Sequence, residues 1–150
     1  MHAVHELPPI TVTTRDFDRL VAFGLDAHLR GDSHADFLLW ELRRATLCPG
    51  ALPGEVVSVN CRVRYRLDDE PAVREHRFVH PLDRADLPDE LSVASPVGVA
   101  LLGLRVGDRM PYCDNRLGTQ HVVTVEGIET TAASSGPVRR RRFSPNGRRR

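Results

Sequence analysis

The sequence predicts an α+β fold in which a short N-terminal antiparallel helical hairpin precedes an antiparallel sheet that clasps one short helix. Three observations lead to this prediction. Apolar residues recur at helical spacing before residue 46, they alternate with polar residues over residues 57–66, and a helix-start signal stands at Ser95 and Pro96. A chain of 150 residues, 41% of them hydrophobic, is long enough to build one such core.

The first helix is expected near residues 15–27. Thr14 suits its N-cap, because a threonine side chain can accept a hydrogen bond from a free N–H group of the first turn. Four residues then follow at the spacing of one helical face: Phe17, Leu20, Val21 and Gly24. Residues 28–32, which include Gly31, are expected to form a tight connection.

A second helix is expected to begin at Ser33, which suits another N-cap, and to be ended by Pro49 and Gly50. Apolar residues form a stripe along it: Leu38, Leu42 and Ala45. Two short helices with a short link predict an antiparallel hairpin. The single tryptophan, Trp40, is expected to pack within that hairpin.

The period of the pattern changes to two after the hairpin. Alternation over residues 57–66 predicts a half-buried strand, or two strands joined by a bend, with Cys61 on the inward side. Further strands are expected at four places: residues 73–80, 91–94, 109–112 and 120–129. Turns are expected at residues 68–71 and 115–118, where Asp, Pro, Asn and Gly gather.

The stretch of residues 91–108 reads LSVASPVGVALLGLRVGD. Ser95 is expected to cap a helix that has Pro96 at its first position and stops at Gly103. Five apolar residues of the stretch are expected in the core: Leu91, Val93, Leu101, Leu102 and Val106. Ser95 and Pro96 themselves are expected at the surface, as a helix cap and as a surface for a partner.

Charge is unevenly distributed along the chain. The formal net charge is +1, but residues 134–150 hold seven arginines and no acidic residue, which leaves 14 arginines against 20 acidic residues in residues 1–133. An acidic body is not suited to having nucleic acid wrapped around it, whereas the arginines of the tail can pair with phosphates. The tail is expected to be disordered, because Gly, Pro, Ser and like charges cannot repay the entropy of folding.

Several classes of protein are disfavoured by composition. All 21 basic residues are arginine, which excludes a Walker phosphate loop and a Schiff-base lysine. The three cysteines are far apart, so free thiols are expected rather than a disulfide framework or a zinc site. No signal peptide or membrane span is expected, because the longest apolar run, residues 97–104, is too short. We therefore expect a cytoplasmic monomer without cofactor or metal.

At SVNCRVRYR (residues 58–66) and at LSVASPVGVALLGLRVGD the sequence resembles the bacterial family called regulator of nucleoside diphosphate kinase (Rnk), relatives of the Gre transcript-cleavage factors. The likeness extends from about Pro9 to Thr131 and includes ELRRATLC at residues 41–48. It implies an FKBP-like C-terminal domain behind a shortened coiled coil. The expected division is residues 1–50 for the hairpin segment, 51–133 for the domain and 134–150 for the tail.

The resemblance implies a non-catalytic transcription modulator that binds RNA polymerase at the rim of its secondary channel and competes with Gre factors. The Ser-Pro segment of Gre relatives contacts that rim, which here gives four contact residues: Ser95, Pro96, Val97 and Gly98. Ala94 stands where a Gre factor can carry an acidic residue. This departure weakens one polar contact of the family pattern.

The tip of the hairpin departs further from the Gre pattern. In Gre factors a Gly-Asp-x-x-Glu-Asn tip carries an acidic pair that supports metal-dependent RNA cleavage, whereas here Asp32 matches and Ala35 replaces the glutamate. A helix of about 15 residues is also only about 22 Å long. Cleavage stimulation is therefore not expected, and Asp26 and Asp32 are assigned only as tip contacts.

Two other functions stay open from the residues. An FKBP-like fold allows a prolyl isomerase, although aromatic residues make up only 5% of the chain. The tail allows weak binding of RNA or DNA, with four adjacent arginines as candidate contacts: Arg139, Arg140, Arg141 and Arg142. Two further groups are interpreted as structural or solvated rather than functional: the pair His76 and His80, and the row Arg62, Arg64 and Arg66.

Overall fold

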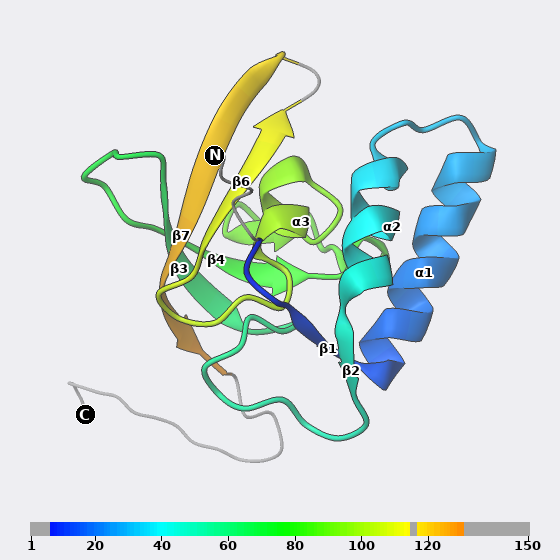
Figure 1. The fold of residues 1–150 in the computed structure, drawn as a ribbon, viewed down its shortest axis with the longest axis horizontal. Helices are drawn as coiled ribbons and strands as arrows, with labels where there is room; N and C mark the ends of the chain where they lie inside the picture. Colours follow the sequence, from blue (N-terminus) through cyan, green and yellow to red (C-terminus); the bar gives the residue numbers. More distant parts are fainter. Residues whose placement is uncertain (1–6, 115–116, 131–150) are drawn as a thin grey trace, which may run out of the picture.

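The computed structural model describes residues 7–114 and 117–130. Its helices and strands succeed one another along the chain as β1 (Thr11–Thr13), α1 (Thr14–Leu29), α2 (Ala35–Arg44), β2 (Thr46–Cys48), β3 (Arg62–Leu67), β4 (Arg74–Val79), η1 (Pro81–Asp83), β5 (Glu90–Ser92), α3 (Pro96–Leu101), β6 (Arg109–Asp114) and β7 (Thr119–Glu129). Helices α1 and α2 lie beside each other, and α3 lies between α2 and the strands β6 and β7 (Figure 1).

Both N-terminal helices form, but their caps differ from the prediction. Helix α1 is capped by Thr13, whose Oγ1 accepts a hydrogen bond from the Asp16 N–H at 3.0 Å, so that Thr14 is already helical. Helix α2 starts two residues after Ser33, with His34 at the N-cap position and no side-chain hydrogen bond to cap it. The predicted Ser33 cap is therefore wrong.

A small parallel sheet at the base of the two helices was not predicted. Helix α2 ends at Arg44, and β2 then pairs in parallel with β1, Thr11 opposite Thr46. The Thr46 N–H donates to the Ile10 carbonyl at 2.9 Å, and the Thr11 N–H donates to the Gly103 carbonyl at 3.2 Å. The chain is thus already extended before Pro49, and both helices are tied to the rest of the fold.

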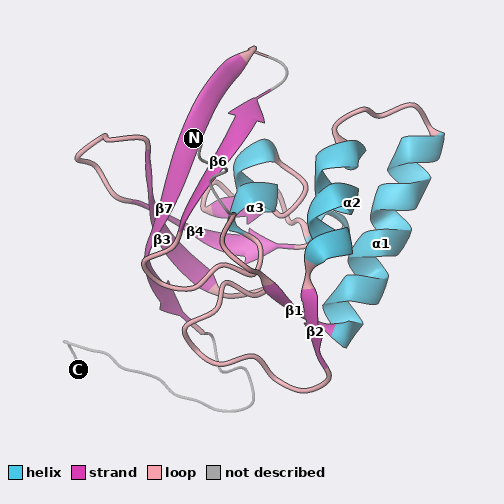
Figure 2. Cartoon of the chain, in the orientation of Figure 1, coloured by secondary structure: helices cyan, strands magenta, loops and turns pink. Residues whose placement is uncertain are grey.

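The main sheet has five strands in the order β5-β4-β3-β7-β6 and curls around α3 (Figure 2). Most of its neighbouring strands are antiparallel, as predicted, but β5 pairs in parallel with β4. The sheet is therefore antiparallel-rich rather than purely antiparallel. The predicted turn before β7 includes residues 115 and 116, which lie outside the described residues.

The alternating segment becomes a strand later than predicted. Val57, Cys61, Val63 and Tyr65 are all buried, as the alternation requires, but β3 begins only at Arg62. Asn60 has a φ of +79°, in the left-handed region, and breaks the extended chain just before the strand. The alternative of two extended pieces joined by a bend describes this segment better than one continuous strand.

Helix α3 lies in the hydrophobic core, where it contacts α2 on one side and the strands β6 and β7 on the other. Val93, Leu101 and Leu102 are at most 1% exposed, as predicted, and Leu91 is partly buried against them. Val106 is 43% exposed, so its assignment to the core is wrong. Gly103 follows the helix with a φ of +76°, and a Cβ there would lie 2.8 Å from the Cβ of Ile10, so this position requires glycine.

Candidate functional site

The N-terminus of α3 is built by Ser95. The Ser95 Oγ accepts a hydrogen bond from the Gly98 N–H at 3.1 Å and donates one to the Ser92 carbonyl at 2.7 Å. Pro96 occupies the first turn, where no N–H group is needed. The Ser95 hydroxyl is thus occupied within the fold, and Pro96 is the residue that it holds in place at the surface.

The other two predicted contact residues differ in their access to a partner. Gly98 is buried, and a Cβ at this position would collide with the Ser92 carbonyl oxygen. Val97 packs against the core but keeps partial exposure, as do Ala94, Ser95 and Pro96. Gly98 therefore supports the Ser95–Pro96 edge from inside, whereas Val97 remains partly accessible.

Pro96 and the start of helix α2 line the same small groove. The groove is formed by α2, β6 and the α3 region and is lined by His34, Phe37, Ala94, Pro96, Val99 and Cys113. A second groove adjoins it through two shared residues and is lined by Phe23, Ala27, Asp32, His34, Ala35, Leu38 and Ala94. The structure thus brings Pro96 and Asp32 to one surface, although they are 64 positions apart in the sequence.

His34 and Phe37 line the groove beside Pro96, and His34 also lines the second groove with Asp32. Neither residue was predicted as a contact. Their sequence positions carry no local motif for binding. Only the packing of α2 beside α3 brings them to Pro96. Asp26 lies farther from Pro96, because it lines a third groove, with Arg19 and His80, that shares only Phe23 with the second groove.

The tip of the helical pair, residues 26–36, carries one exposed ion pair and two exposed histidine–aspartate contacts. Asp26 contacts Arg30 at 3.0 Å, the Nδ1 of His28 lies 3.1 Å from Asp36, and the Nδ1 of His34 lies 3.3 Å from Asp32. With neutral histidines the four charged side chains sum to −2, since Arg30 offsets one of the three aspartates. The tip is therefore acidic.

The base of the helical pair contains a buried charge. Glu41 is 1% exposed, and its carboxylate accepts two hydrogen bonds from Arg44, each of 2.9 Å. Arg44 also donates to the Pro8 carbonyl at 2.8 Å and touches the Met110 sulfur. This network connects α2 to the N-terminal segment and to β6, which fixes the position of α2 next to the groove.

Comparison with known proteins shows to which family this chain belongs. The family model described as the Rnk N-terminus matches residues 8–47, and the model for the C-terminal part of transcription elongation factors GreA/GreB matches residues 52–130. A protein of Escherichia coli (strain K12) called regulator of nucleoside diphosphate kinase is 40% identical over 106 residues, which are 70% of this chain and 78% of that one. The chain belongs to the Rnk family. The protein of that name from Shigella flexneri matches to the same extent.

A solved structure extends this relationship to the elongation factors. The prokaryotic transcription elongation factor GreA/GreB from Nitrosomonas europaea aligns with a TM-score of 0.61 at 28% identity, over 80% of this chain and 98% of that one. The Rnk-family chain therefore shares a GreA/GreB-like fold. Its relatives are named as regulators and elongation factors.

The exposed tryptophan contradicts the sequence prediction for this Rnk-family chain. Trp40 is 61% exposed on α2 instead of packing within the helical pair. The two helices approach closely without it, because a Cβ at Gly24 would lie 2.7 Å from the Leu39 Cδ2. Leu39 fills the space next to α1 that Trp40 was expected to occupy.

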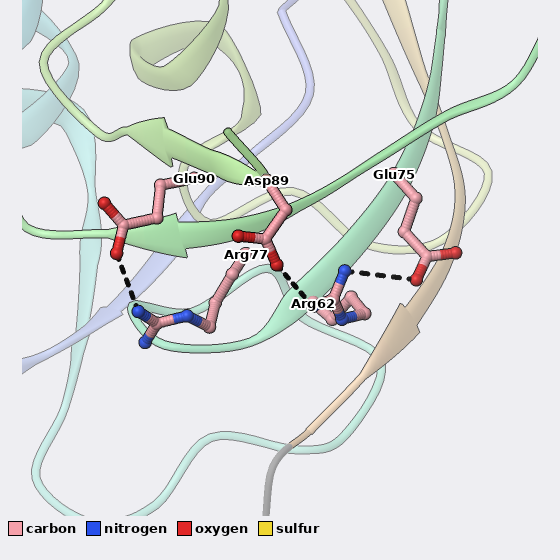
Figure 3. A network of polar contacts seen from close by, with 5 residues as sticks. All are labelled: Arg62, Glu75, Arg77, Asp89 and Glu90. Carbon is pink, nitrogen blue, oxygen red and sulfur yellow. Dashed lines mark hydrogen bonds and ion pairs between the residues drawn. The ribbon is translucent and has the colours of Figure 1, made fainter. Parts of the chain in front are cut away.

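The arginine row of β3 faces outward but is largely paired. Figure 3 shows Arg62 between Glu75 and Asp89, at 3.3 and 2.8 Å, with Arg77 paired to Glu90 at 2.8 Å nearby. Arg66 contacts Glu126 at 3.3 Å, and only Arg64 of the row is fully at the surface. The interpretation of a solvated face agrees with this arrangement, and ion pairs neutralise most of its charge.

The two histidines that were considered as a pair have separate surroundings. His76 lies 2.9 Å from the Tyr65 hydroxyl, whereas His80 is buried and accepts a hydrogen bond from the Leu82 N–H at 3.0 Å. Burial lowers the pKa of both rings, with the neighbouring arginines Arg74 and Arg19 adding to the effect. Within residues 7–114 and 117–130, no group of three His, Cys, Asp or Glu side chains is arranged for a metal ion.

Other predictions concern the chemistry and the ends of the chain. All three cysteines are free, and Cys61 is buried, as predicted. The tail and its candidate contacts Arg139, Arg140, Arg141 and Arg142 lie outside the described residues. In the part of the chain that the structure describes, no helix combines the length and the apolar character that crossing a bilayer requires.

Proposed function

We propose that this protein is a non-catalytic transcription modulator that binds RNA polymerase at the rim of the secondary channel. Ser95 and Pro96 form the contact edge, and the protein competes with Gre factors for the same surface. The observation that carries this proposal is the match of residues 52–130 to the GreA/GreB C-terminal part, combined with a partly exposed Pro96 that Ser95 holds at the start of α3.

The tip supports a role that does not include cleavage of RNA. Ala35 stands where the Gre pattern has the second acidic residue, and it is buried against the helical pair. Where the Gre pattern has an acidic pair, Asp32 here contacts His34. Helix α2 has 10 residues and is therefore about 15 Å long, which is shorter than the sequence predicted.

The same family relationship supports four finer assignments as part of this proposal. We assign the globular part to the FKBP-like fold and the helical pair to a shortened coiled coil. We assign the protein to the cytoplasm, where the polymerase is, and expect it to act as a monomer.

Pro96→Arg is the variant that tests the proposed contact edge. Arginine at the first helical position requires no partner that proline lacks, because the N–H group there is free in any helix, and its carbonyl can accept as the proline carbonyl does, so the fold is expected to persist. Immobilised core RNA polymerase should retain the wild-type protein, and excess Gre factor should displace it. Pro96→Arg should bind at least tenfold more weakly, which corresponds to about 1.4 kcal/mol.

Pro111→Arg provides the matched control. Pro111 is an exposed proline of β6 that does not line either groove beside α3. The same change of charge and size there should leave the affinity for polymerase unchanged. Failure of the wild-type protein to bind core polymerase would overturn the proposed function, as would equal affinities of the wild type and a folded Pro96→Arg variant.

A further inference from the structure

We propose that the polymerase-binding surface continues from Pro96 onto helix α2 and includes His34 and Phe37 as contact residues. We call this surface the α2–α3 groove; it consists of His34, Phe37, Ala94, Pro96, Val99 and Cys113. It fits a protein surface that places an apolar side chain next to a basic group. The proposal rests on the proposed function and specifies the partner chemistry of the same site.

Most of the residues that line the α2–α3 groove are apolar. Phe37 and Pro96 come from different helices and line the same depression, with Ala94 and Val99 also lining it. Both Phe37 and Pro96 are only partly buried. The depression encloses only about 10 Å³, so a partner side chain that covers Pro96 lies over its mouth, next to Phe37. The expected occupant is therefore an apolar side chain that covers the mouth of the depression and contacts both residues.

His34 and Asp32 form a polar pair beside the apolar residues of the groove. The Asp32 carboxylate accepts a hydrogen bond from the His34 backbone N–H at 3.0 Å and lies 3.3 Å from the Nδ1 of the same residue. When the ring carries a single proton on Nδ1, next to the carboxylate, Nε2 is an acceptor. A donor on the partner, such as an arginine or lysine side chain, satisfies this acceptor.

The charge of the tip favours the same partner chemistry. The four charged side chains of residues 26–36 sum to −2 with neutral histidines, and Asp32 is the aspartate that lines the adjoining groove next to Ala94. An acidic surface beside an apolar groove attracts a basic surface that carries an apolar side chain. Raising the salt concentration should therefore weaken binding of the wild-type protein to polymerase.

His34 is well suited to a test because its side chain does not support the fold. It occupies the N-cap position of α2 without making a capping hydrogen bond, and it is 42% exposed in its contact with Asp32. His28 offers a matched control: it is also a histidine of the tip, at 3.1 Å from an aspartate, but it does not line the α2–α3 groove. Both residues can be replaced by alanine at little cost in stability.

The first experiment compares His34→Ala and His28→Ala in binding to core RNA polymerase. His34→Ala should lower the affinity about tenfold, the loss expected for one hydrogen bond that a charged group shares. His28→Ala should bind within a factor of two of the wild type. Equal affinities of the two variants, with both folded by circular dichroism, would contradict the contact assigned to His34.

The second experiment uses Cys113 as a reporter in the unmodified protein. Cys113 lines the α2–α3 groove, whereas Cys48 ends β2 at the base of the helical pair, and both thiols are free and partly exposed. Bound polymerase should slow the alkylation of Cys113 by iodoacetamide several-fold and leave that of Cys48 unchanged, as read by mass spectrometry of the peptides. Unchanged alkylation of Cys113 in the complex would overturn the extended surface.

The two proposals fail in different ways. If the wild-type protein does not bind polymerase, the proposed function and the extended surface fall together. If Pro96→Arg abolishes binding while His34→Ala binds normally and Cys113 stays reactive, the contact is confined to the start of α3. That result would sink the extension onto α2 and leave the proposed function standing.

Discussion

The two ends of the helical pair use charge in opposite ways. At the base, Glu41 is 1% exposed and shares two hydrogen bonds with Arg44, which also binds the Pro8 carbonyl. At the tip, one ion pair and two histidine–aspartate contacts join side chains that are between 42% and 69% exposed. Exposed pairs contribute little to stability, whereas a broken buried pair is costly. The base therefore holds the shape of the protein, and the tip is free to serve a partner.

The largest effect is expected when the base is broken on one side. Arg44→Met leaves the buried Glu41 carboxylate without its partner and should lower the free energy of unfolding by about 3–5 kcal/mol. Urea denaturation followed by circular dichroism measures this loss. Glu41→Leu combined with Arg44→Met removes both charges and should restore most of the stability. A single variant as stable as the wild type would break the contrast between base and tip.

The edge that carries Pro96 should show an intermediate effect. Ser95→Ala removes the cap of α3 and should cost about 1 kcal/mol of unfolding free energy, the usual contribution of such a cap. Ser95→Thr keeps the hydroxyl and should cost less. A loss above 3 kcal/mol would mean that Ser95 belongs with the structural base rather than with the binding edge.

A smaller effect is expected from the exposed contact that joins α1 to η1. The Arg19 guanidinium donates to Asp83 at 3.1 and 3.2 Å and holds the pKa of the Asp83 carboxyl below its ordinary value. The contact therefore stabilises the fold above the unfolded pKa of about 3.9 and is lost as the pH falls through the lower pKa of the folded state. Its contribution is below about 1 kcal/mol, because both side chains are exposed.

Arg19→Gln tests the sign of that pH dependence. The wild type should be slightly more stable than the variant at pH 7, and the two should become equally stable as the pH approaches 2. Thermal denaturation at each pH provides the comparison. A difference that grows on acidification would show that Asp83 is not the group responsible.

The smallest effect is expected at the tip. Asp26→Asn removes an exposed ion pair with Arg30 and should change the free energy of unfolding by less than about 0.5 kcal/mol. Chemical denaturation of this variant beside Arg44→Met gives the contrast directly. If Asp26→Asn and Arg44→Met lose comparable unfolding free energy, the tip and the base do not differ in their contribution to stability.

Features that depend on neighbours in the sequence were predictable. The Ser95 cap, the Pro96 helix start and the inward position of Cys61 follow from local hydrogen bonding and from a period of two, and the structure confirms them. The β1–β2 pairing was not predictable, because two strands of three residues have no readable period and their contact joins distant segments.

Two errors have instructive causes. Trp40 lies two positions from Leu38, which places it on the other side of the α2 stripe, so its exposure follows the helical period rather than the general tendency of tryptophan to be buried. His34 and Phe37 escaped notice because their role depends on α2 lying beside α3. Only the three-dimensional packing makes them neighbours of Pro96, and no local pattern encodes that packing.

The most direct test of the account is site-specific crosslinking to core RNA polymerase. A photoreactive amino acid at position 96 should crosslink the protein to polymerase, and excess Gre factor should suppress the crosslink. The same amino acid at position 111, an exposed position of β6 that does not line the groove, should give none. Crosslinks from position 111 with none from position 96 would contradict the assignment of the polymerase contact to the start of α3.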